Sequence, residues 1–152
     1  QNPLGFWIRC FYCDCMANRA DKKVFGSYLL IICVEKKSTF QVGALGQIAF
    51  AAGYYAYVGS ALNHQLVNRC LRHAKPPSEK KTHWHIDYVL SHENAFLERI
   101  LAIPSDYREE CELAATIKKQ AKGMVEKFGC SDCSCSSHLF FFGKKEPSFL
   151  KT

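Results

Sequence analysis

The chain has 152 residues, of which 48% are hydrophobic and 13% aromatic, so it is long and apolar enough to bury the core of one globular domain. This composition excludes a disordered chain, and the apolar run Tyr28–Val34 has the length of a strand, not of a membrane-spanning helix. The net charge of +6 favours polyanionic partners such as nucleic acids, but an ordinary solvated basic surface explains it equally well.

Residues 1–23 are interpreted as an amino-terminal extension. Residues 1–15 are rich in aromatic residues and cysteine, show no strand or helix periodicity, and lack the charged start and small-residue exit of a secretion signal. Met16 and the polar residues after it are typical of an ordinary protein start, so we interpret the preceding residues as an added or upstream-translated piece. The cysteine spacing Cys10-x-x-Cys13-x-Cys15 is compatible with metal binding.

The next residues predict a meander of antiparallel strands with glycine corners. The β-branched and apolar run Val24–Glu35 indicates a buried central strand, and the alternation over Tyr54–Val58 indicates a second strand. Between them, Phe40–Val42 and Gln47–Phe50 are expected to pair as a short hairpin.

A helix is expected from about Leu62 to Lys75, with an apolar stripe at helical spacing. The stripe comprises Leu66, Val67, Cys70, Leu71 and Ala74. Pro76-Pro77 ends this helix, because proline removes a backbone donor and clashes with the preceding turn. A short helix is then expected over Trp84–Ser91, followed by a strand over Ala95–Ile103.

The third helix is expected to begin at a cap on Ser105 or Asp106 and to continue to Phe128. Its apolar stripe comprises Leu113, Ile117, Ala121, Met124 and Phe128. One turn before Leu113 this stripe reaches Glu110, which is therefore expected to face inward. Because an unpaired buried carboxylate is costly, Glu110 needs a partner, either a divalent cation or Arg69. A capping or salt-bridged glutamate is the purely structural alternative.

A polar loop over Gly129–Ser137 and a last strand over His138–Phe142 complete a domain that spans residues 24–142. Residues 143–152 are polar and are expected to form a loose tail. Strands and helices of this kind predict a single α+β domain without internal repeats.

Several side chains in this plan suit phosphodiester chemistry. Gly26-Ser27-Tyr28 and Tyr57-Val58-Gly59 each place a phenol at an expected strand end. Arg69 and His73 are four residues apart and share a helix face; a guanidinium grips phosphate through a planar fork, and an imidazole titrates near neutrality. A surface arginine and histidine on a basic helix explain this pair equally well.

The segment His83–Tyr88 packs two histidines, an aspartate and two aromatic residues at a helix start. His85 is a candidate site residue, and His85 and Asp87 are also suited to position phosphate or to cap the helix. Trp84 is suited to stack on a base, although packing in the core is the commoner fate of a tryptophan.

The chain contains nine cysteines, an odd number that fits a complete disulfide framework poorly and favours a reduced, cytoplasmic location. Cys33 and Cys70 lie in apolar segments and are interpreted as small core residues. The polar loop brings soft ligands close together, as a structural zinc site requires. The candidate ligands are Cys133, Cys135 and His138, with Cys111 or Cys130 as the fourth. A disulfide or a hydrogen-bonded loop is an equal alternative, because the paired Cys-x-x-Cys knuckles of specific zinc motifs are missing.

In their order along the chain, these residues resemble the motifs of the GIY-YIG nuclease superfamily. The motif residues are Gly26-Ser27-Tyr28, Tyr57-Val58-Gly59, Arg69 with His73, and Glu110. Longer segments resemble a poorly characterised prokaryotic branch of that superfamily, some of whose members are joined to a DNA-repair glycosylase of the endonuclease III type. These segments are Gly53–Ala61, Trp84–Tyr88, Glu110–Ala114 and Ser131–Leu139, and the resemblance covers about residues 24–142.

The resemblance implies a small antiparallel sheet of three central strands, here with an inserted hairpin, flanked by helices. It also implies a metal-dependent endonuclease acting on DNA in repair or recombination, with DNA and a repair glycosylase as candidate partners and no membrane. Tyr28 and Tyr57 match the paired tyrosines, and Arg69 matches the phosphate-binding arginine. Glu110 matches the ligand of Mg²⁺ or Mn²⁺, and His73 matches a position that is histidine in part of the family.

The chain departs from the family pattern at three points. Ser27 replaces the usual isoleucine, and the inserted hairpin makes the gap between the two tyrosine triplets longer than usual. The asparagine that closes the site in many members has no clear match.

The expected mechanism is hydrolysis in which Tyr28, assisted by His73 or Tyr57, deprotonates the attacking water. Arg69 would bind the non-bridging oxygens, and Glu110 would hold the metal ion. Basic residues after the helix would bind the DNA backbone. They are Arg72, Lys75, Lys80 and Lys81. Two rival hypotheses are a non-catalytic module that binds DNA and recruits a repair enzyme, and a zinc-dependent interaction domain.

Overall fold

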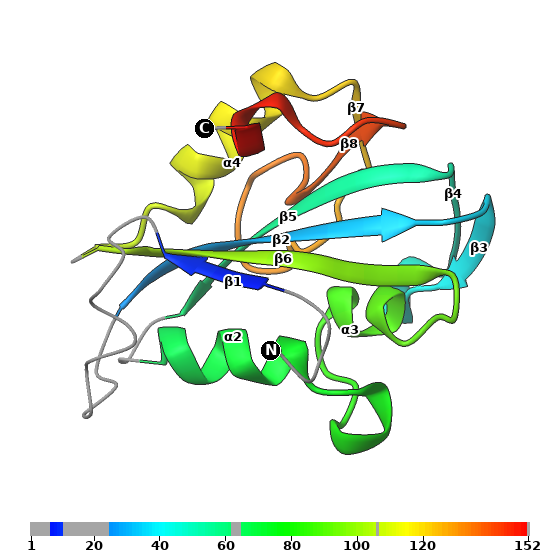
Figure 1. Cartoon of the computed structure of the whole chain (residues 1–152), viewed down its shortest axis with the longest axis horizontal. Coiled ribbons are helices and arrows are strands. Elements are labelled where there is room, and N and C mark those ends of the chain that lie inside the picture. Colours follow the sequence, from blue (N-terminus) through cyan, green and yellow to red (C-terminus); the bar gives the residue numbers. More distant parts are fainter. Residues whose placement is uncertain (1–6, 11–24, 62–64, 106, 152) are drawn as a thin grey trace.

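The computed structural model describes residues 7–10, 25–61, 65–105 and 107–151 (Figure 1). Some of the expectations above therefore lie outside the described residues. They concern most of the extension before residue 24, the cysteines Cys13 and Cys15 with the side chain of Cys10, the start of the first helix at Leu62, and the cap at Asp106.

A six-stranded sheet forms the centre of the molecule, with the strand order β1-β6-β2-β5-β8-β7. Its strands are β1 (Trp7–Cys10), β2 (Gly26–Val34), β5 (Gly53–Ala61), β6 (Ala95–Pro104), β7 (Gly123–Met124) and β8 (Leu139–Gly143). The edge strand β1 runs parallel to β6, and every other neighbouring pair is antiparallel. The α+β class expected from the sequence is confirmed, with three antiparallel strands, β6, β2 and β5, at the middle of the sheet.

The central strand β2 is buried along nearly its whole length, and it is mostly apolar because both of its faces are covered. Tyr28, Leu30 and Ile32 point into one core, whereas Leu29 and Ile31 point into the other. The sheet therefore separates two hydrophobic cores.

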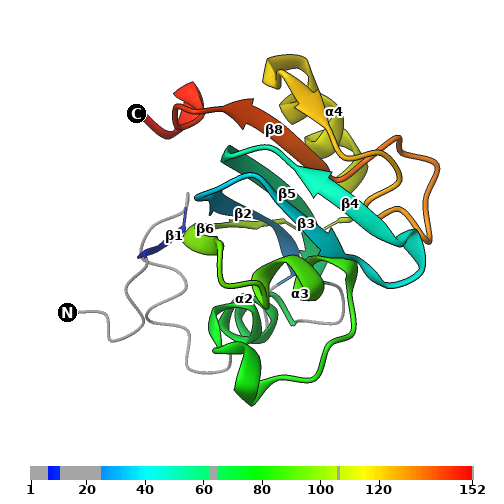
Figure 2. The same cartoon turned by 90° about the vertical axis from the view of Figure 1, so that its right-hand side faces the viewer.

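Helices cover both faces of this sheet (Figures 1 and 2). The helices α2 (Leu66–Ala74) and α3 (His85–Leu90) pack on the face that carries Tyr28, through apolar side chains such as Leu66 and Ile86. The helix α4 (Glu110–Gln120) packs on the other face through Ala114 and Ile117.

The expected hairpin is present as a two-stranded sheet of β3 (Ser38–Gln41) and β4 (Gln47–Phe50), joined by a 3₁₀ turn over Gly43–Leu45. The rings of Phe40 and Phe50 lie 4.7 Å apart, and both side chains are buried in the core under α3. The hairpin leaves the main sheet undisturbed, because β2 and β5 pair along their full length.

The helix expected up to Lys75 ends at Ala74, and its buried stripe differs from the expected one. Leu71 is exposed, because it lies about 100° around the helix from the buried Cys70. His73 faces inward instead.

The third helix is shorter than expected, since it ends at Gln120 and not at Phe128. Gly123–Met124 instead forms β7 beside β8, and Phe128 is buried in the core on the opposite side of the sheet from α4. The expected cap at Ser105 is wrong too: the helix begins after Glu109, and the Ser105 hydroxyl donates to the carbonyl of Tyr107.

The expectation of a loose carboxyl-terminal tail is contradicted by its packing. Residues Ser148–Lys151 form a 3₁₀ turn, Leu150 is buried and Phe149 packs against the core beneath α4. Glu146 forms an ion pair with Arg99 of β6 at 3.4 Å.

Two smaller expectations about side chains have different outcomes. Cys70 is buried as expected, whereas Cys33 is only half-buried.

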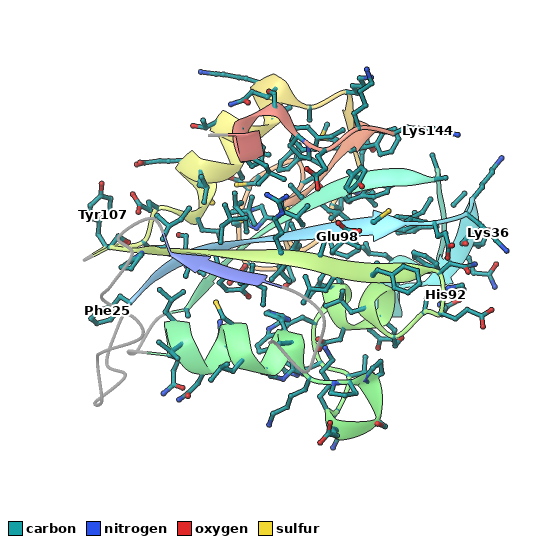
Figure 3. The ribbon with its side chains drawn as sticks, in the orientation of Figure 1. Phe25, Lys36, His92, Glu98, Tyr107 and Lys144 are labelled. Carbon is teal, nitrogen blue, oxygen red and sulfur yellow. The ribbon has the colours of Figure 1, made fainter. Side chains whose placement is uncertain are left out.

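In Figure 3, Phe25 and Tyr107 mark one end of the sheet and Lys36 and His92 the other. Among the described residues, no helix is both long and apolar enough to span a membrane.

Candidate active site

The two tyrosines that the sequence singled out lie side by side on neighbouring strands. In the register of β2 and β5, Tyr28 is opposite Gly59 and Leu30 is opposite Tyr57, so the two phenols are diagonal neighbours on one face. Their ring centroids are 6.5 Å apart.

Gly59 is what allows the Tyr28 ring to take this position. The ring lies directly over Gly59, and a Cβ atom at that position would overlap the ring and its hydroxyl. A glycine inside a strand at a point of close approach is the expected solution. This requirement gives a physical reason for the glycine of the Tyr57-Val58-Gly59 triplet.

The two phenols open into a cavity of about 190 Å³. Six of the residues singled out from the sequence line this cavity: Tyr28, Tyr57, Arg69, Trp84, His85 and Glu110. They come from β2, β5, α2, α4 and the amino-terminal end of α3. The structure thus brings together side chains from segments far apart in the chain, whereas His73 lies behind Tyr28 and is buried.

Glu110 reaches this cavity although the body of α4 covers the opposite face of the sheet. The strand β8 follows β5 only as far as the hydrogen bond from the Val58 N–H to the His138 carbonyl. Among the described residues, the end of β5, Gly59–Ala61, therefore has no neighbouring strand on that side. Glu110 is the first residue of α4 and enters there, with 7% of its surface exposed. The positive end of the helix dipole favours a carboxylate at this place.

The ion-pair partner of Glu110 is Arg108, not Arg69. The Arg108 Nη2 lies 3.3 Å from Glu110 Oε1 and 3.5 Å from Asp132 Oδ2, and Asp132 also lines the cavity. The Arg108 side chain is 43% exposed, so this pair adds little stability and can open. Two carboxylates beside one cavity are hard oxygen ligands, and they fit a Mg²⁺ or Mn²⁺ ion that keeps several water ligands.

Arg69 is held at the rim of the cavity by the strand that carries Tyr57. Its Nη1 donates to the Ser60 carbonyl at 2.7 Å, and its guanidinium lies 4.8 Å from the centre of the Trp84 ring. A guanidinium has five N–H donors, so one backbone bond leaves most of this capacity for a phosphate.

The hydroxyl of Tyr28 forms a buried hydrogen bond with His73 Nε2 at 2.8 Å. Burial raises the pKa of Tyr28 well above its usual value, and the neighbouring Tyr57 adds to this effect. Burial also lowers the pKa of His73 to about 3, against the attraction of Asp87. Both groups are therefore neutral at pH 7.

Tyr57 and His85 are neutral at pH 7 for related reasons. Burial, and then the charge of Glu110, raise the pKa of Tyr57. Burial lowers the pKa of His85, whose Nδ1 accepts a hydrogen bond from the Gly129 N–H at 2.9 Å. Because Nδ1 accepts, the neutral ring carries its proton on Nε2 and has a donor available there.

The basic residues expected to bind DNA gather around a second cavity of about 510 Å³ beside the first. They are Arg72, Lys75, Lys80 and Lys81. His83 lines both cavities, so the two are adjacent at that residue. We call this second cavity the basic groove.

Two of these basic residues have structural partners. Arg72 pairs with Asp87 through two hydrogen bonds of 2.9 and 3.0 Å, donates to the Lys81 carbonyl and lies over Trp84, so it is not free for phosphate as expected. The Nζ of Lys80 donates to the His73 carbonyl at 3.1 Å, and burial lowers the pKa of Lys80. Lys75 and Lys81 are exposed.

Asp87 caps the start of α3 and does not line the cavity. Its Oδ2 accepts hydrogen bonds from the N–H groups of His83 and Trp84, each at 2.9 Å. Burial acts to raise the pKa of Asp87, but the hydrogen bonds from Arg72 and from these N–H groups hold it below its usual value. Of the alternatives considered for Asp87, the structure selects the cap.

Sequence reasoning missed several residues that line the cavity, notably Ser60, His83 and Asp132. Ser60 contributes its carbonyl to Arg69, a contact that no side-chain pattern reveals. Asp132 lies inside the cysteine-rich loop, where the cysteines alone suggested a function. The one sign of Asp132 in the sequence was an acidic side chain between serine and cysteine residues.

Three residues of the cysteine-rich loop and Cys111 of α4 form a cluster of possible metal ligands next to this cavity. The ligand atoms of Cys111, Cys133, Cys135 and His138 all lie within 4.8 Å of one another. The alternative ligand Cys130 is outside this group, and its Sγ donates to the Phe128 carbonyl at 3.3 Å. The structure therefore selects Cys111 as the fourth member of a cluster that could bind a metal ion.

Comparison with known proteins yields a family but no activity. The model of a family described as "Domain of unknown function DUF123" matches residues 27–151, a range that includes every residue lining the cavity. No curated protein and no solved structure matches the chain. The function of the cavity has to follow from its own residues.

Proposed function

The chain belongs to the DUF123 family, and from its cavity we propose that it is a metal-dependent endonuclease that hydrolyses DNA phosphodiester bonds. One observation carries the proposal: two phenols, a guanidinium and a carboxylate from four distant segments line a single cavity of about 190 Å³. The resemblance of the same residues to the motifs of GIY-YIG nucleases supports it. A role in DNA repair or recombination belongs to the same proposal.

Arg69 binds the non-bridging oxygens of the scissile phosphate. The bond to the Ser60 carbonyl and the contact with Trp84 hold the guanidinium in one orientation, and its remaining N–H groups are donors for two phosphate oxygens. These donors become more valuable as negative charge develops on the phosphorane, since they are already oriented.

Tyr28 accepts the proton of the attacking water. In this mechanism the Tyr28 O–H donates to His73 Nε2, which lies 2.8 Å away, so the phenol oxygen presents lone pairs toward the cavity. As the water oxygen attacks phosphorus, the water proton passes to Tyr28 and the Tyr28 proton passes to His73, while the ester oxygen leaves with the bonding electrons. The departing oxygen then takes a proton from solvent, and His73 returns its proton through Tyr28 to solvent, which restores both neutral groups.

Glu110, with Asp132, would hold Mg²⁺ or Mn²⁺. When bound, the ion would supply positive charge that stabilises the leaving oxygen. In the free protein, burial keeps both Tyr28 and His73 neutral, and an anionic phosphate next to the pair makes protonation of His73 easier.

An indole, Trp84, and an imidazole, His85, also line the cavity. The Trp84 ring lies against the guanidiniums of Arg69 and Arg72 and so positions these two cations. His85 offers its Nε2–H as a donor to phosphate or sugar oxygens. The basic groove continues from His83 and supplies exposed lysines for the DNA backbone.

The proposal is tested by measuring cleavage of plasmid, single-stranded and branched DNA with Mg²⁺, with Mn²⁺ and with a chelator. We expect cleavage only with a divalent cation. Glu110→Gln should reduce the rate by about 100-fold or more, because it removes the anionic ligand. Glu112→Gln on the exposed side of the same helix is the matched control and should keep the wild-type rate.

Full activity of Glu110→Gln would contradict the proposed mechanism. Tight DNA binding without cleavage under any metal would instead favour a non-catalytic module that recruits a repair enzyme. The exposed Arg108 also allows a separate check: Arg108→Gln removes the competing cation and should lower the Mn²⁺ concentration needed for half-maximal cleavage.

A further inference from the structure

We propose that Cys111, Cys133, Cys135 and His138 bind one structural zinc ion, and that His138 connects this ion to Glu110. The zinc site itself does not depend on the proposed nuclease activity. Only the catalytic value of the link to Glu110 rests on that proposal.

The four ligand atoms come from two segments that the fold places together. Cys111 lies in the first turn of α4, whereas the other three belong to the loop that leads into β8. Three thiols and one imidazole form a ligand set of the Cys₃His type, which suits zinc in a closed, four-coordinate site.

The distances match a tetrahedral site. With Zn–S bonds of about 2.3 Å and Zn–N bonds of about 2.05 Å, a tetrahedron has S···N edges of about 3.6 Å and S···S edges of about 3.8 Å. The Cys133 Sγ lies 3.5 Å from His138 Nε2, and all ligand atoms lie within 4.8 Å of one another. Shifts well below 1.5 Å would therefore bring the four ligands to bonding positions around one ion.

Hydrogen bonds hold both ends of this loop, since the Gly129 N–H donates to His85 Nδ1 and the His138 N–H donates to the Phe128 carbonyl. Residues 129–138 contain no helix or strand, and most of them are exposed or half-buried. A metal bound by Cys133, Cys135 and His138 would close this loop, and Cys111 would anchor it to α4. A single disulfide would join only two of the three thiols and would leave His138 without a role.

The orientation of His138 connects the cluster to the cavity. Its ring is buried, with Nε2 toward Cys133 and Nδ1 3.8 Å from Glu110 Oε1. An imidazole that binds a metal through one nitrogen keeps its proton on the other and donates it, commonly to a carboxylate. Cys111 also follows Glu110 directly in the helix, so the zinc ion would fix both the backbone and the carboxylate of Glu110.

The first measurement is the metal content of protein purified without chelators, together with its free-thiol count. We expect one zinc per chain in the wild type and in Cys130→Ser, which changes the neighbouring cysteine outside the cluster. Cys111→Ser and Cys133→Ser should each weaken zinc binding by about tenfold or more. Glu110→Gln should keep its zinc, because Glu110 is not a ligand.

Cobalt substitution of the wild-type protein tests the site without any mutation that endangers folding. Co²⁺ in place of zinc should give intense visible bands of a tetrahedral ion and a thiolate charge-transfer band in the near ultraviolet, titrating to one equivalent. Removal of the zinc should lower the melting temperature.

A folded wild-type protein that binds neither zinc nor cobalt would overturn the proposal, as would a disulfide within the cluster. Loss of zinc in Cys130→Ser with retention in Cys111→Ser would overturn the ligand assignment. None of these measurements uses DNA. Zinc binding without nuclease activity would therefore reject the proposed function alone, and nuclease activity without zinc binding would reject the zinc site alone.

Discussion

The hydrogen bond between Tyr28 and His73 shows how burial decides the state of single residues in this site. Neither group is charged at pH 7, although a tyrosine next to a histidine is often interpreted as an ionised pair. His73 was expected to assist Tyr28, and the structure places it behind Tyr28, buried and within hydrogen-bond distance of that phenol.

The lowered pKa of His73 predicts a pH-dependent stability. Between its folded value of about 3 and its ordinary value of 6.5, the unfolded chain binds a proton that the folded protein does not bind. The free energy of unfolding therefore falls as the pH drops through this window, by up to about 1.4 kcal/mol per pH unit for this one group.

His73→Gln removes this contribution, and urea unfolding of both proteins at pH 6.5 and pH 5 measures it. The wild type should lose about 1.6 kcal/mol more than the variant over this interval, because the unfolded histidine is already half protonated at pH 6.5. His85 and His138, whose pKa values burial also lowers, contribute equally to both proteins. Asp87 titrates below the interval, because its pKa is below its usual value. Identical pH dependence in the two proteins would contradict a buried neutral His73.

Tyr28→Phe tests the role of the phenol oxygen. The substitution removes the hydrogen bond to His73. It keeps the ring over Gly59, so the fold should persist. If Tyr28 accepts the proton of water, the cleavage rate should fall by about 100-fold or more while DNA affinity is unchanged. Tyr55→Phe is a control, because the Tyr55 hydroxyl binds the Ala51 carbonyl away from the cavity. Loss of activity through weaker DNA binding alone would contradict this role.

Sequence reasoning located individual site residues better than it located their partners. The inward direction of Glu110 followed from helical spacing, and the structure agrees. Its pairing with Arg108 did not follow, since that contact depends on how the chain enters α4. Arg72 was wrongly expected to be free, because the buried Asp87 that holds it belongs to a different helix.

At the scale of elements, the register of β2 and β5 creates the site. Tyr28 lies across from Gly59, and Tyr57 lies across from Leu30, so a shift of one strand by one residue would put the two phenols on opposite faces of the sheet. The long gap between the two triplets has no effect on this register, since the hairpin of β3 and β4 is excluded from the main sheet.

Gly59→Ala is predicted to destabilise the protein by about 1–3 kcal/mol, because the added methyl group would overlap the Tyr28 ring. It should also displace that ring and reduce cleavage. Gly123→Ala is the matched control in a strand, since a Cβ there meets no heavy atom within 4 Å. Urea unfolding compares the two variants. Equal stabilities would show that the Tyr28 ring does not depend on Gly59.

The boundaries of α4 show what local patterns could not predict. An apolar stripe at helical spacing continues past Gln120, and Gly123 was the only local sign of an end. The chain leaves the helix because Lys122 and Val125 donate hydrogen bonds to the carbonyls of Phe141 and Leu139 in β8. Those partners lie more than ten residues downstream, so tertiary pairing overrides the local helical preference.

At the scale of the whole molecule, the site depends on an opening in the sheet. The tyrosines and α4 lie on opposite faces, and Glu110 joins the tyrosines only because β8 stops short of the end of β5. The α+β class and most strands were predictable from periodicity. The passage of Glu110 past the end of β8 was not predictable, because it depends on the relative lengths of two strands that are distant in sequence.

The position of the basic groove predicts how DNA affinity depends on salt. Replacing both Lys75 and Lys81 by alanine should weaken DNA binding and reduce the slope of log affinity against log salt by about 1 for each lost phosphate contact. Lys144→Ala is a control, because Figure 3 places Lys144 across the sheet from α2. Fluorescence anisotropy at several salt concentrations measures the slopes. An equal effect of the Lys144 variant would indicate that DNA does not follow the groove.

The most direct test of a shared catalytic cavity is the single-turnover cleavage rate at saturating protein concentration, which separates chemistry from binding. The measurement compares the wild type with Tyr28→Phe, Tyr57→Phe, Arg69→Gln and Glu110→Gln, and with the double alanine variant of Lys75 and Lys81. We predict that every cavity variant is slow at saturation, whereas the groove variant regains the wild-type rate. Wild-type rates at saturation in the cavity variants, or no cleavage by the wild-type protein with any divalent cation, would contradict the assignment of this cavity as a nuclease site.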